Sequence, residues 1–538
     1  MLSSMRLHVF LYINRLFPEN YVFYYLYTYK GECFAMSLEQ LKQQYNETKK
    51  RIASYEEAIA LMFWDMRTGA PKKGLEQRSE VIGMLSSDVF KLSTSKEFEE
   101  VLHALLKEEN FQQVSEVMQK SLLESKKNFD RNKKIPAEEY QAYVVLSSKS
   151  EAVWEEAKEK SDFSMLQPYL EKLVAYNKKF IEYLGYKGNK YNTLLDMFEP
   201  GMTVEKLDQV FGQLKEHIVP LVKSISESDY KFDASALLFH FPKDKQKEFS
   251  LEVLHELDYD FSAGRLDETV HPFAVGINPG DVRVTTKYDE KDFRTAVFGT
   301  IHECGHALYE QNISPELIGT GLCSGTSMGI HESQSLFYEN FVGRNYSFWK
   351  RHYNRLNECA DGKFSEMSLD AFYEAINEAK PSLIRIEADE LTYCLHIIIR
   401  YELEKALFND EITVEELPKK WNEKYEQYLG ITPPNDARGV LQDVHWSGGS
   451  FGYFPSYALG YMYAAQLKQA MLKDIPNFDE KLENGELKEV KEWLAEKVHQ
   501  HGKMKKPLEI LKDVTGEELN VTYLIQYLED KYKTLYKL

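Results

Sequence analysis

The sequence has few cysteines, no long hydrophobic run and a deficit of positive charge, and each shortage excludes a class of protein. Its five cysteines, at positions 33, 304, 323, 359 and 394, are too few and too scattered among 538 residues for a disulfide framework. They suit a reducing compartment. No run approaches the roughly 18 apolar residues that span a bilayer. The net charge of −19 argues against nucleic acid and anionic membranes as partners.

The first 35 residues differ from the rest of the chain. They are rich in tyrosine and phenylalanine, and the apolar run from Leu7 to Ile13 reaches only the lower limit of a signal-peptide core. The alternative is that translation starts at Met36, because MSLEQLKQQYNETKKRI opens like a helical domain. We therefore separate an N-terminal extension, 1–35, which is either a mis-assigned start or an unstructured segment, from one domain, 36–538.

Helical patterning dominates that domain. From about residue 37 to 230, apolar residues recur at intervals of three and four, as in amphipathic helices. Between about 258 and 290 the pattern alternates, and FAVGINPGDVRVTTKY, with Asn278-Pro279-Gly280 as its turn, predicts a β-hairpin. Helical patterning then resumes. The sequence predicts a mainly α fold, a single large helical domain with a small antiparallel β-sheet.

The candidate chemistry lies where histidines gather, since nine of the fourteen fall between residues 240 and 445. HECGH places His302 and His306 one turn apart on a helix, so both imidazoles can reach one metal ion. Glu303 projects from the neighbouring edge, where it can act on water without being a ligand. Cys304 lies about 200° around the helix from His302, so we expect it to face away and pack in the core.

A catalytic zinc site needs a third protein ligand. The segment GTGLCSGTSMG leads into a second helix, IHESQSLFYENF, which contains Glu332, 26 residues after His306. His331, beside it, is either a partner of a ligand or a surface residue. Spacing alone leaves three other glutamates as alternatives: Glu310, Glu316 and Glu339.

These motifs resemble those of the carboxypeptidase Taq family of metallocarboxypeptidases. Beside HECGH and HESQS, further segments match in order: WDMRTGAPKKG from Trp64, GRLDETVHPF from Gly264, DVRVT from Asp281, IRIEAD from Ile384 and GVLQDVHW from Gly439. The match covers essentially everything from residue 37 to 538. It implies a mostly helical fold with a deep active-site groove, similar to peptidases of the neurolysin and angiotensin-converting-enzyme type.

The resemblance also implies the chemistry. One divalent ion, zinc or sometimes cobalt, is expected on His302, His306 and Glu332, with Glu303 as general base. The expected reaction removes single C-terminal amino acids from peptides with broad specificity, in a cytoplasmic homodimer. One alternative is an oligopeptidase or dipeptidyl carboxypeptidase of the same fold. An alternative of another class is a catalytically inactive peptide-binding protein.

A carboxypeptidase must also bind a free carboxylate, which a guanidinium does with two hydrogen bonds. Arg385 is the first candidate, and its alternative is a solvated helix ion pair with Asp389. Arg283 in DVRVT is the second candidate, or else a strand residue paired with Asp281. His271 is expected either to hydrogen-bond the substrate or to cap the sheet.

The transition state needs donors for its developing oxyanion. Related zinc peptidases of this shape place a histidine and then two tyrosines near the site, which correspond to His445, Tyr453 and Tyr457. We assign His445 and Tyr457 to the oxyanion and Tyr453 to peptide binding, while core packing is the alternative for each tyrosine. Asp443 is expected to orient His445 or a zinc ligand.

Overall fold

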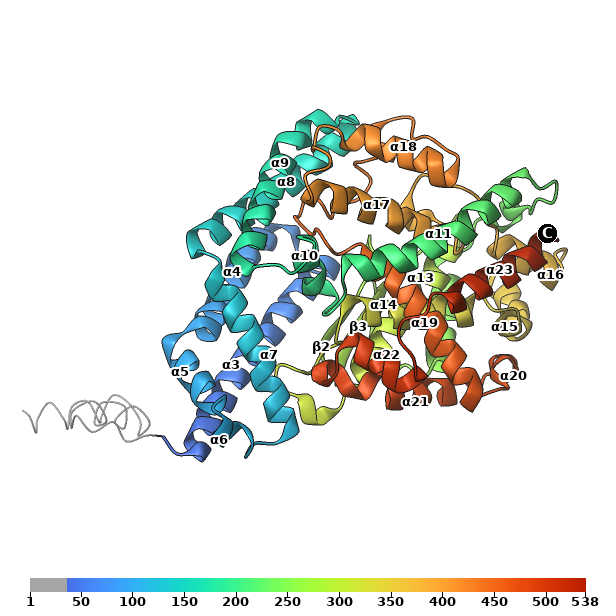
Figure 1. Cartoon of the computed structure of the whole chain (residues 1–538). Coiled ribbons are helices and arrows are strands. Elements are labelled where there is room, and N and C mark those ends of the chain that lie inside the picture. The colour runs from blue at the N-terminus through green and yellow to red at the C-terminus, as the bar shows by residue number, and fades with distance from the viewer. Residues whose placement is uncertain (1–35) are drawn as a thin grey trace, which may run out of the picture.

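The computed structural model describes residues 36–538, so the extension 1–35 lies outside the described residues. The described chain is mainly helical, as predicted, and a small sheet lies among the helices (Figure 1). The N-terminal helices are α3 (Leu38–Thr68), α4 (Leu75–Thr94), α5 (Lys96–Leu105), α6 (Glu108–Phe111) and α7 (Glu116–Lys134). They are followed by α8 (Ala137–Lys160), α9 (Phe163–Leu184), α10 (Asn192–Phe198), α11 (Val204–Glu227) and α12 (Lys243–Glu256).

After the sheet, helices continue to the end of the chain. They are α13 (Arg294–Gln311), α14 (Met328–Leu336), α15 (Tyr346–Cys359), α16 (Leu369–Ile376), α17 (Tyr393–Phe408), α18 (Leu417–Leu429), α19 (Pro455–Asp474), α20 (Phe478–Asn484), α21 (Leu487–Lys497), α22 (Pro507–Thr515) and α23 (Thr522–Tyr536). A π-helical turn, Phe337–Gly343, directly follows α14.

Helix α3 opens with a capping box. The Ser37 hydroxyl accepts a hydrogen bond from the Gln40 backbone N–H, and the Gln40 side chain accepts one from the Ser37 backbone N–H. These bonds satisfy N–H groups that no helical carbonyl can reach. The helix predicted at the start of residues 36–538 is therefore present.

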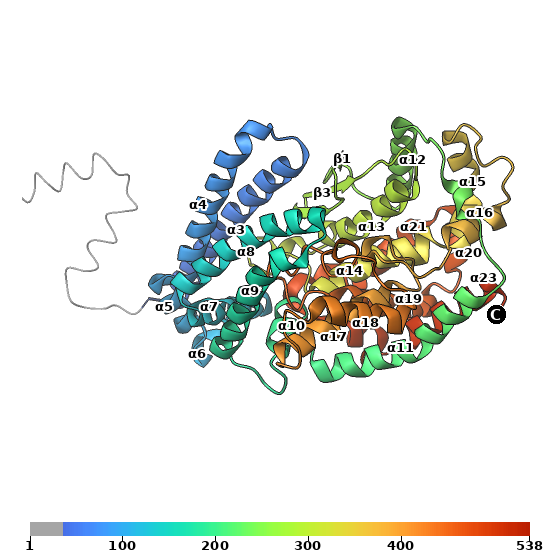
Figure 2. The same cartoon turned by 90° about the horizontal axis from the view of Figure 1, so that it is seen from above.

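Two hydrophobic clusters form the interior. The larger one extends from Ala157 to Tyr536, and the smaller one unites α3, α5 and α7. In both ribbon views α3–α9 gather at one end of the molecule (Figures 1 and 2). Ser121 on α7 connects these N-terminal helices to the helices that follow the sheet, because its hydroxyl donates a 2.5 Å hydrogen bond to the Thr320 carbonyl. The N-terminal helices thereby contact the loop between α13 and α14.

The sheet has three strands, β1 (Leu266–Glu268), β2 (Ala274–Asn278) and β3 (Asp281–Thr286), in the order β1-β3-β2. The predicted hairpin is present, since β2 and β3 pair antiparallel. The sheet as a whole is mixed and not antiparallel, because β1 pairs parallel to the other edge of β3. The three residues of β1 show no alternation that could have revealed this pairing.

Helices α13, α14 and α19 pack closely, and two glycines allow it. A Cβ atom on Gly305 of α13 would lie 2.4 Å from the Gln334 carbonyl oxygen of α14. A Cβ atom on Gly460 of α19 would lie 2.6 Å from the Glu332 Cβ, also on α14. Both separations are far inside van der Waals contact. Gly305 is the glycine of HECGH, so the motif itself fixes the distance between the first two helices.

Replacing Gly305 with alanine is expected to destabilise the protein by about 1–3 kcal/mol, because α13 and α14 must move apart to admit the methyl group. Thermal unfolding measures this loss. The matched control is Gly299→Ala on the same helix, where nothing lies within 4 Å of the added Cβ. That change should be neutral or stabilising, because alanine is the better helix former. Equal melting temperatures for the two variants would contradict the packing argument.

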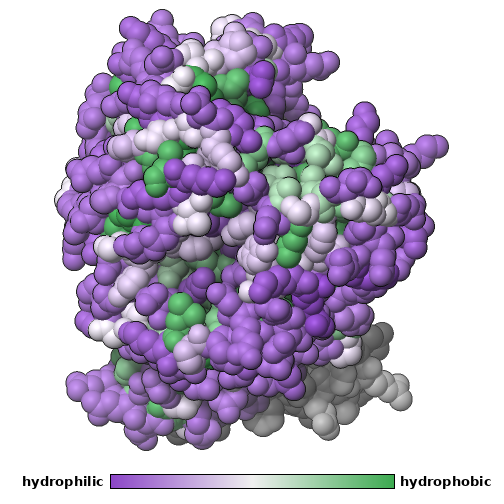
Figure 3. Space-filling model, turned by 90° about the vertical axis from the view of Figure 1, so that its right-hand side faces the viewer, coloured by the Kyte–Doolittle hydropathy of each residue, from purple (hydrophilic) through white to green (hydrophobic). Residues whose placement is uncertain are grey.

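The surface is largely polar, as expected for a chain rich in charged residues. The face in Figure 3 is predominantly hydrophilic, with apolar residues in separate groups. Among the described residues, no helix combines the length and the apolar character required for a membrane span.

Candidate active site

Two neighbouring helices bring three metal-ligand side chains together. His302 and His306 lie one turn apart on α13, and Glu332 lies on α14. The Glu332 Oε2 atom is 4.0 Å from His302 Nε2 and 3.6 Å from His306 Nε2. Ligands of a tetrahedral zinc ion with bonds of about 2.1 Å lie about 3.4 Å apart, so this donor set fits a metal ion with small adjustments. Residues 36–538 contain no other cluster of this kind.

His302 is oriented through its second ring nitrogen. Its Nδ1 lies 2.9 Å from Glu339 Oε2, and Glu339 also pairs with Arg344 at 3.2 Å. Glu339 stands in the π-helical turn Phe337–Gly343, and π-helical turns are frequent at functional sites. A carboxylate at Nδ1 fixes the tautomer in which Nε2 carries the lone pair. That nitrogen faces Glu332.

His306 is held by a chain of two further residues. Its Nδ1 lies 2.7 Å from Nδ1 of His331, and Nε2 of His331 lies 2.9 Å from Glu310 Oε1. If His306 offers Nε2 to a metal, its Nδ1–H donates to His331, and the Nε2–H of His331 donates to Glu310. His331 is thus a partner of a candidate ligand and not a surface residue.

The alternatives for the third ligand lie elsewhere. Glu339 contacts His302 at Nδ1, the ring nitrogen opposite the Nε2 near Glu332, and Glu310 contacts His331, which is not one of the clustered residues. Glu316 is exposed in the short 3₁₀ turn after α13. The geometry therefore groups only Glu332 with the two histidines.

Glu303 and Cys304, which lie between the two histidines, are both buried. Glu303 is buried, and this burial raises the pKa of its carboxyl group to about 7, with His302 opposing the shift and Glu332 adding to it. Cys304 is fully buried in the large hydrophobic cluster, and burial raises the pKa of its thiol. The prediction that Cys304 packs in the core is confirmed.

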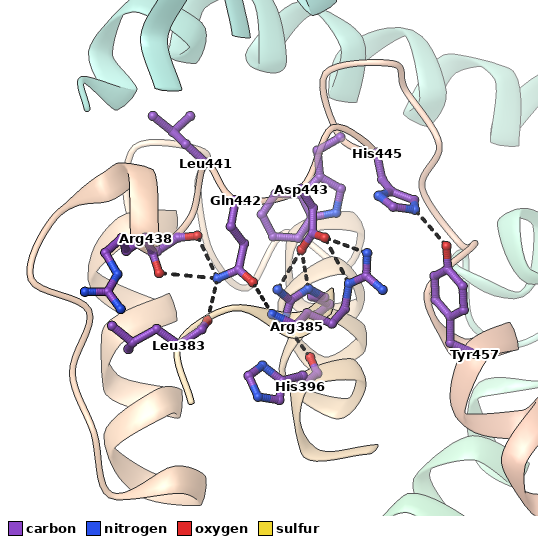
Figure 4. A network of polar contacts seen from close by, with 12 residues as sticks. Leu383, Arg385, His396, Arg438, Leu441, Gln442, Asp443, His445 and Tyr457 are labelled. Atoms are coloured by element: carbon purple, nitrogen blue, oxygen red, sulfur yellow. Dashed lines mark hydrogen bonds and ion pairs between the residues drawn. The ribbon is translucent and has the colours of Figure 1, made fainter. Parts of the chain in front are cut away.

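Arg385 lies in a buried ion-pair group and not on a helix surface (Figure 4). Its Nε and Nη2 atoms lie 2.9 and 2.8 Å from Asp443 Oδ1, and Arg400 pairs with the other carboxylate oxygen at 2.6 Å. The arginines hold the pKa of Asp443 well below its usual range despite the burial of this carboxylate. Among the described residues, no group accepts a hydrogen bond from Arg385 Nη1. That nitrogen is available to another carboxylate.

The expected alternative for Arg385, an ion pair with Asp389, is wrong. Arg385 starts a 3₁₀ turn, Arg385–Glu387, so the helical spacing on which that pair depends is absent. Asp389 instead accepts a 2.7 Å hydrogen bond from the Thr392 hydroxyl at the start of α17. Gln442 fixes the Arg385 backbone, because its Oε1 accepts the Arg385 N–H at 2.9 Å (Figure 4).

His445 and Tyr457 contact each other beside this group. The His445 Nε2 atom lies 3.2 Å from the Tyr457 hydroxyl, and the Tyr457 ring centre lies 4.9 Å from the Arg385 guanidinium carbon (Figure 4). Burial lowers the pKa of His445 to about 4 and raises that of Tyr457, so both are neutral near pH 7. The expectation that Asp443 orients His445 is wrong, because the Asp443 carboxylate contacts the two arginines.

Tyr453, Arg283 and His271 complete the set of predicted residues. Tyr453 packs edge-on against Tyr457, with ring centres 5.1 Å apart. Arg283 forms the two-bond ion pair with Asp281 that was its alternative reading, at 2.7 Å for each bond. His271 is exposed in the loop before β2.

One residue that the sequence did not suggest holds the start of α14. Glu199 is 1% exposed, accepts a 2.9 Å hydrogen bond from the Gly329 backbone N–H, and accepts another of 2.8 Å from the Tyr463 hydroxyl on α19. Gly329 is in the first turn of α14, three residues before Glu332. Sequence spacing carries no sign of this contact, because residues 199 and 329 are far apart in the chain.

Comparisons with known proteins agree with this architecture. Residues 44–532 match the family model described as carboxypeptidase Taq (M32) metallopeptidase. Carboxypeptidase 1 of Bacillus subtilis is 61% identical over 503 residues, which cover 94% of this chain and 100% of that protein. Thermostable carboxypeptidase 1 of Thermus thermophilus is 38% identical over 93% of this chain and 100% of that protein. The crystal structure of the M32 carboxypeptidase from Deinococcus radiodurans R1 superposes with a TM-score of 0.89 at 32% identity, covering 93% of this chain and 100% of that one.

The fold and the site define a helical metallopeptidase, in which an HExxH helix lies against a helix that carries a glutamate. The chain belongs to the carboxypeptidase Taq (M32) family. It is a metallocarboxypeptidase, a peptide hydrolase of a family that works with a divalent metal ion.

Because Glu199 is buried, we expect the free energy of unfolding to depend on pH. Its pKa is raised from 4.5 to about 7, so the native state holds this proton more tightly than the unfolded chain does. The bound proton of Glu199 therefore contributes fully to the free energy of unfolding below about pH 4.5, and this contribution is lost as the pH rises through about 7. Glu199→Gln mimics the protonated group, so its melting temperature relative to the wild type should increase between about pH 5 and pH 8. A constant difference across that range would contradict the prediction.

Proposed function

We propose that this enzyme is a zinc-type metallocarboxypeptidase that releases single amino acids from peptide C-termini with broad specificity. His302, His306 and Glu332 are its metal ligands. The observation that carries this proposal is the convergence of one ligand atom from each residue within 4.8 Å. Hydrogen bonds at both Nδ1 atoms support it, because they leave the Nε2 atoms free to bind a metal.

A divalent ion held by these residues would act as a Lewis acid and lower the pKa of a bound water molecule toward about 7. Glu303 is the general base. Its carboxylate accepts the proton as water attacks the last peptide carbonyl, and its carboxyl group then protonates the departing amine. Burial raises the pKa of this carboxyl group above its usual value, which favours a group that accepts and then returns a proton.

Arg385 binds the free carboxylate of the substrate. Asp443 occupies one edge of its guanidinium and keeps the plane fixed, while Nη1 remains available. Arg283 is the weaker candidate. It is also paired through Nε and Nη2, with Asp281, but only Arg385 lies beside the Tyr457 ring. His271 and Tyr453 are assigned to binding the rest of the peptide.

Tyr457 and His445 stabilise the oxyanion. The raised pKa of Tyr457 keeps its hydroxyl protonated, and a protonated hydroxyl can donate to a developing negative charge. Position 457 is three residues before Gly460, so the tyrosine lies one turn along the face of α19 that contacts Glu332. This position on α19 supports the proposed role of Tyr457 near the candidate metal ligands.

The reaction is tested by digesting an eight-residue peptide and following the products by mass spectrometry. A ladder that loses one residue at a time is expected, because Arg385 fixes the terminal carboxylate at one distance from the ligands. Losses of two residues would favour a dipeptidyl carboxypeptidase, and internal cuts would favour an oligopeptidase. A protein that binds the peptide and releases nothing would be the inactive peptide-binding alternative.

Glu303→Gln should retain the metal and lose about 10²–10⁴-fold in kcat, because the amide cannot accept the proton. Metal analysis by mass spectrometry and peptide-hydrolysis kinetics measure the two effects, and the same analysis of the wild type distinguishes zinc from cobalt. His302→Ala is the contrasting variant, since it should lose the metal itself. Retained turnover in Glu303→Gln refutes the general-base role.

Arg385→Met should lower kcat/KM for a free-acid peptide by about 10–100-fold, which corresponds to the loss of charge-assisted hydrogen bonds. The same peptide with a C-terminal amide should be affected far less. Arg283→Met is the matched control, because it removes an arginine that pairs with an aspartate through the same two atoms, Nε and Nη2. If Arg283→Met lowers kcat/KM for the free-acid peptide and Arg385→Met does not, Arg283 is the residue that binds the substrate carboxylate.

A cytoplasmic homodimer in which a deep groove admits the substrate completes the proposal. Several large apolar side chains on three neighbouring N-terminal helices support a subunit contact, because they stay exposed in the single chain: Leu61, Phe63, Val81, Met84, Tyr140, Val144 and Val145. Light scattering of the purified protein decides between monomer and dimer.

A further inference from the structure

Helix α17 presents two fully buried charged side chains to the segment that contains His445. Arg400 and Glu404 are four residues apart, so they lie on one face of the helix, and each is 0% exposed. Arg400 binds Asp443, two residues before His445. Glu404 binds the same segment farther along.

Glu404 holds this segment at two points. The Trp446 indole N–H donates a 2.6 Å hydrogen bond to its Oε1, and the Gly452 backbone N–H donates a 2.7 Å hydrogen bond to its Oε2. These donors directly follow His445 and directly precede Tyr453. The carboxylate therefore joins the two ends of the loop that separates these candidate active-site residues.

On its other side, the loop between His445 and Tyr453 packs against α10. Gly452 has φ of +88°, and a Cβ atom there would lie 2.7 Å from the Leu194 backbone of α10. Tyr191, which precedes α10, donates a 2.5 Å hydrogen bond to Glu404 Oε2 from that side. The loop is thus held between α17 and α10, with Glu404 at the centre of the contact.

We propose that Glu404 is a positioning residue, which sets the place of His445 relative to Tyr457 through its bonds to Trp446 and Gly452. This inference rests on the proposed role of His445 and Tyr457 in stabilising the oxyanion. Glu404 itself touches neither residue. A displacement of about 1 Å in a reacting group can cost a hundredfold in rate, so a residue that fixes the loop can control turnover without meeting the substrate.

The carboxylate is suited to this task because it is an acceptor only. Three donors meet its two oxygens, from Tyr191, Trp446 and Gly452. A glutamine would turn an N–H₂ group toward one of them, and two facing donors repel. Glu404→Gln is therefore expected to shift the loop while its size and packing stay the same.

The test is a double-mutant cycle on kcat and KM for a peptide with a free C-terminus. Glu404→Gln should lower kcat about tenfold and leave KM within about twofold, with full metal content. In a His445→Ala background the same change should cost less than about twofold, because the group that it positions is gone. Trp446→Phe removes one loop donor and keeps the packing, so it serves as a second route to the same result if Glu404→Gln folds poorly.

The matched control is Tyr191→Phe. It removes a hydrogen bond from the same carboxylate but leaves both loop donors in place, so kcat should stay within about twofold. Equal losses in Tyr191→Phe and Glu404→Gln, or a Glu404→Gln loss that is unchanged in the His445→Ala background, would overturn the proposal. If His445→Ala alone leaves kcat unchanged, the oxyanion assignment itself fails. The two failures are therefore distinguishable.

Discussion

The close approach of α13, α14 and α19 is the constraint on which the rest of the site depends. Gly305 and Gly460 lie where any side chain would collide with α14, so the backbones meet at distances that only glycine permits. This approach brings Glu332 to within 4.0 Å of both histidine Nε2 atoms. It also explains the residues between the histidines of HECGH: the cysteine fills the core and the glycine is the point of contact. A metal site of three ligands from two helices requires such a fixed separation, because coordination tolerates errors of only a few tenths of an ångström.

A layer of buried and half-buried carboxylates lies around the candidate ligands and substrate-binding groups. Glu339 and Glu310 orient the imidazoles, Asp443 holds Arg385, and Glu404 holds the loop next to His445. Burying a carboxylate costs free energy unless donors meet it, and each of these accepts hydrogen bonds from arginine, histidine, indole or backbone N–H groups. The result is a site in which the charged side chains have few alternative positions. Such preorganisation is what a catalytic centre needs, since no energy is then spent on reorientation during the reaction.

Much of the fold and part of the site could be predicted from the sequence, because the relevant signals are local. Apolar residues at intervals of three and four predicted the helices, and Asn278-Pro279-Gly280 predicted the β2–β3 hairpin. The parallel pairing of β1 was missed, since three residues carry no readable period. The expected contact of Asp443 with His445 is wrong, and so is the pair with Asp389 that was the alternative for Arg385. They assumed neighbours in sequence to be neighbours in space, whereas the actual partners lie on segments tens of residues apart.

Local sequence patterns are enough to identify the available chemistry: two histidines one helical turn apart, a glutamate beside the first, and an arginine and two tyrosines downstream. Helix periodicity fixes the relation between His302 and His306, so no further information was needed there. Spacing left four glutamates open and the family resemblance implied Glu332. The tertiary structure groups Glu332 with the histidines and shows which glutamates contact other nitrogens. That choice depends on how α14 lies against α13, and packing between distant segments sets it. Residues such as Glu199 and Glu404 have no local pattern at all, because their role exists only where separate helices and loops meet.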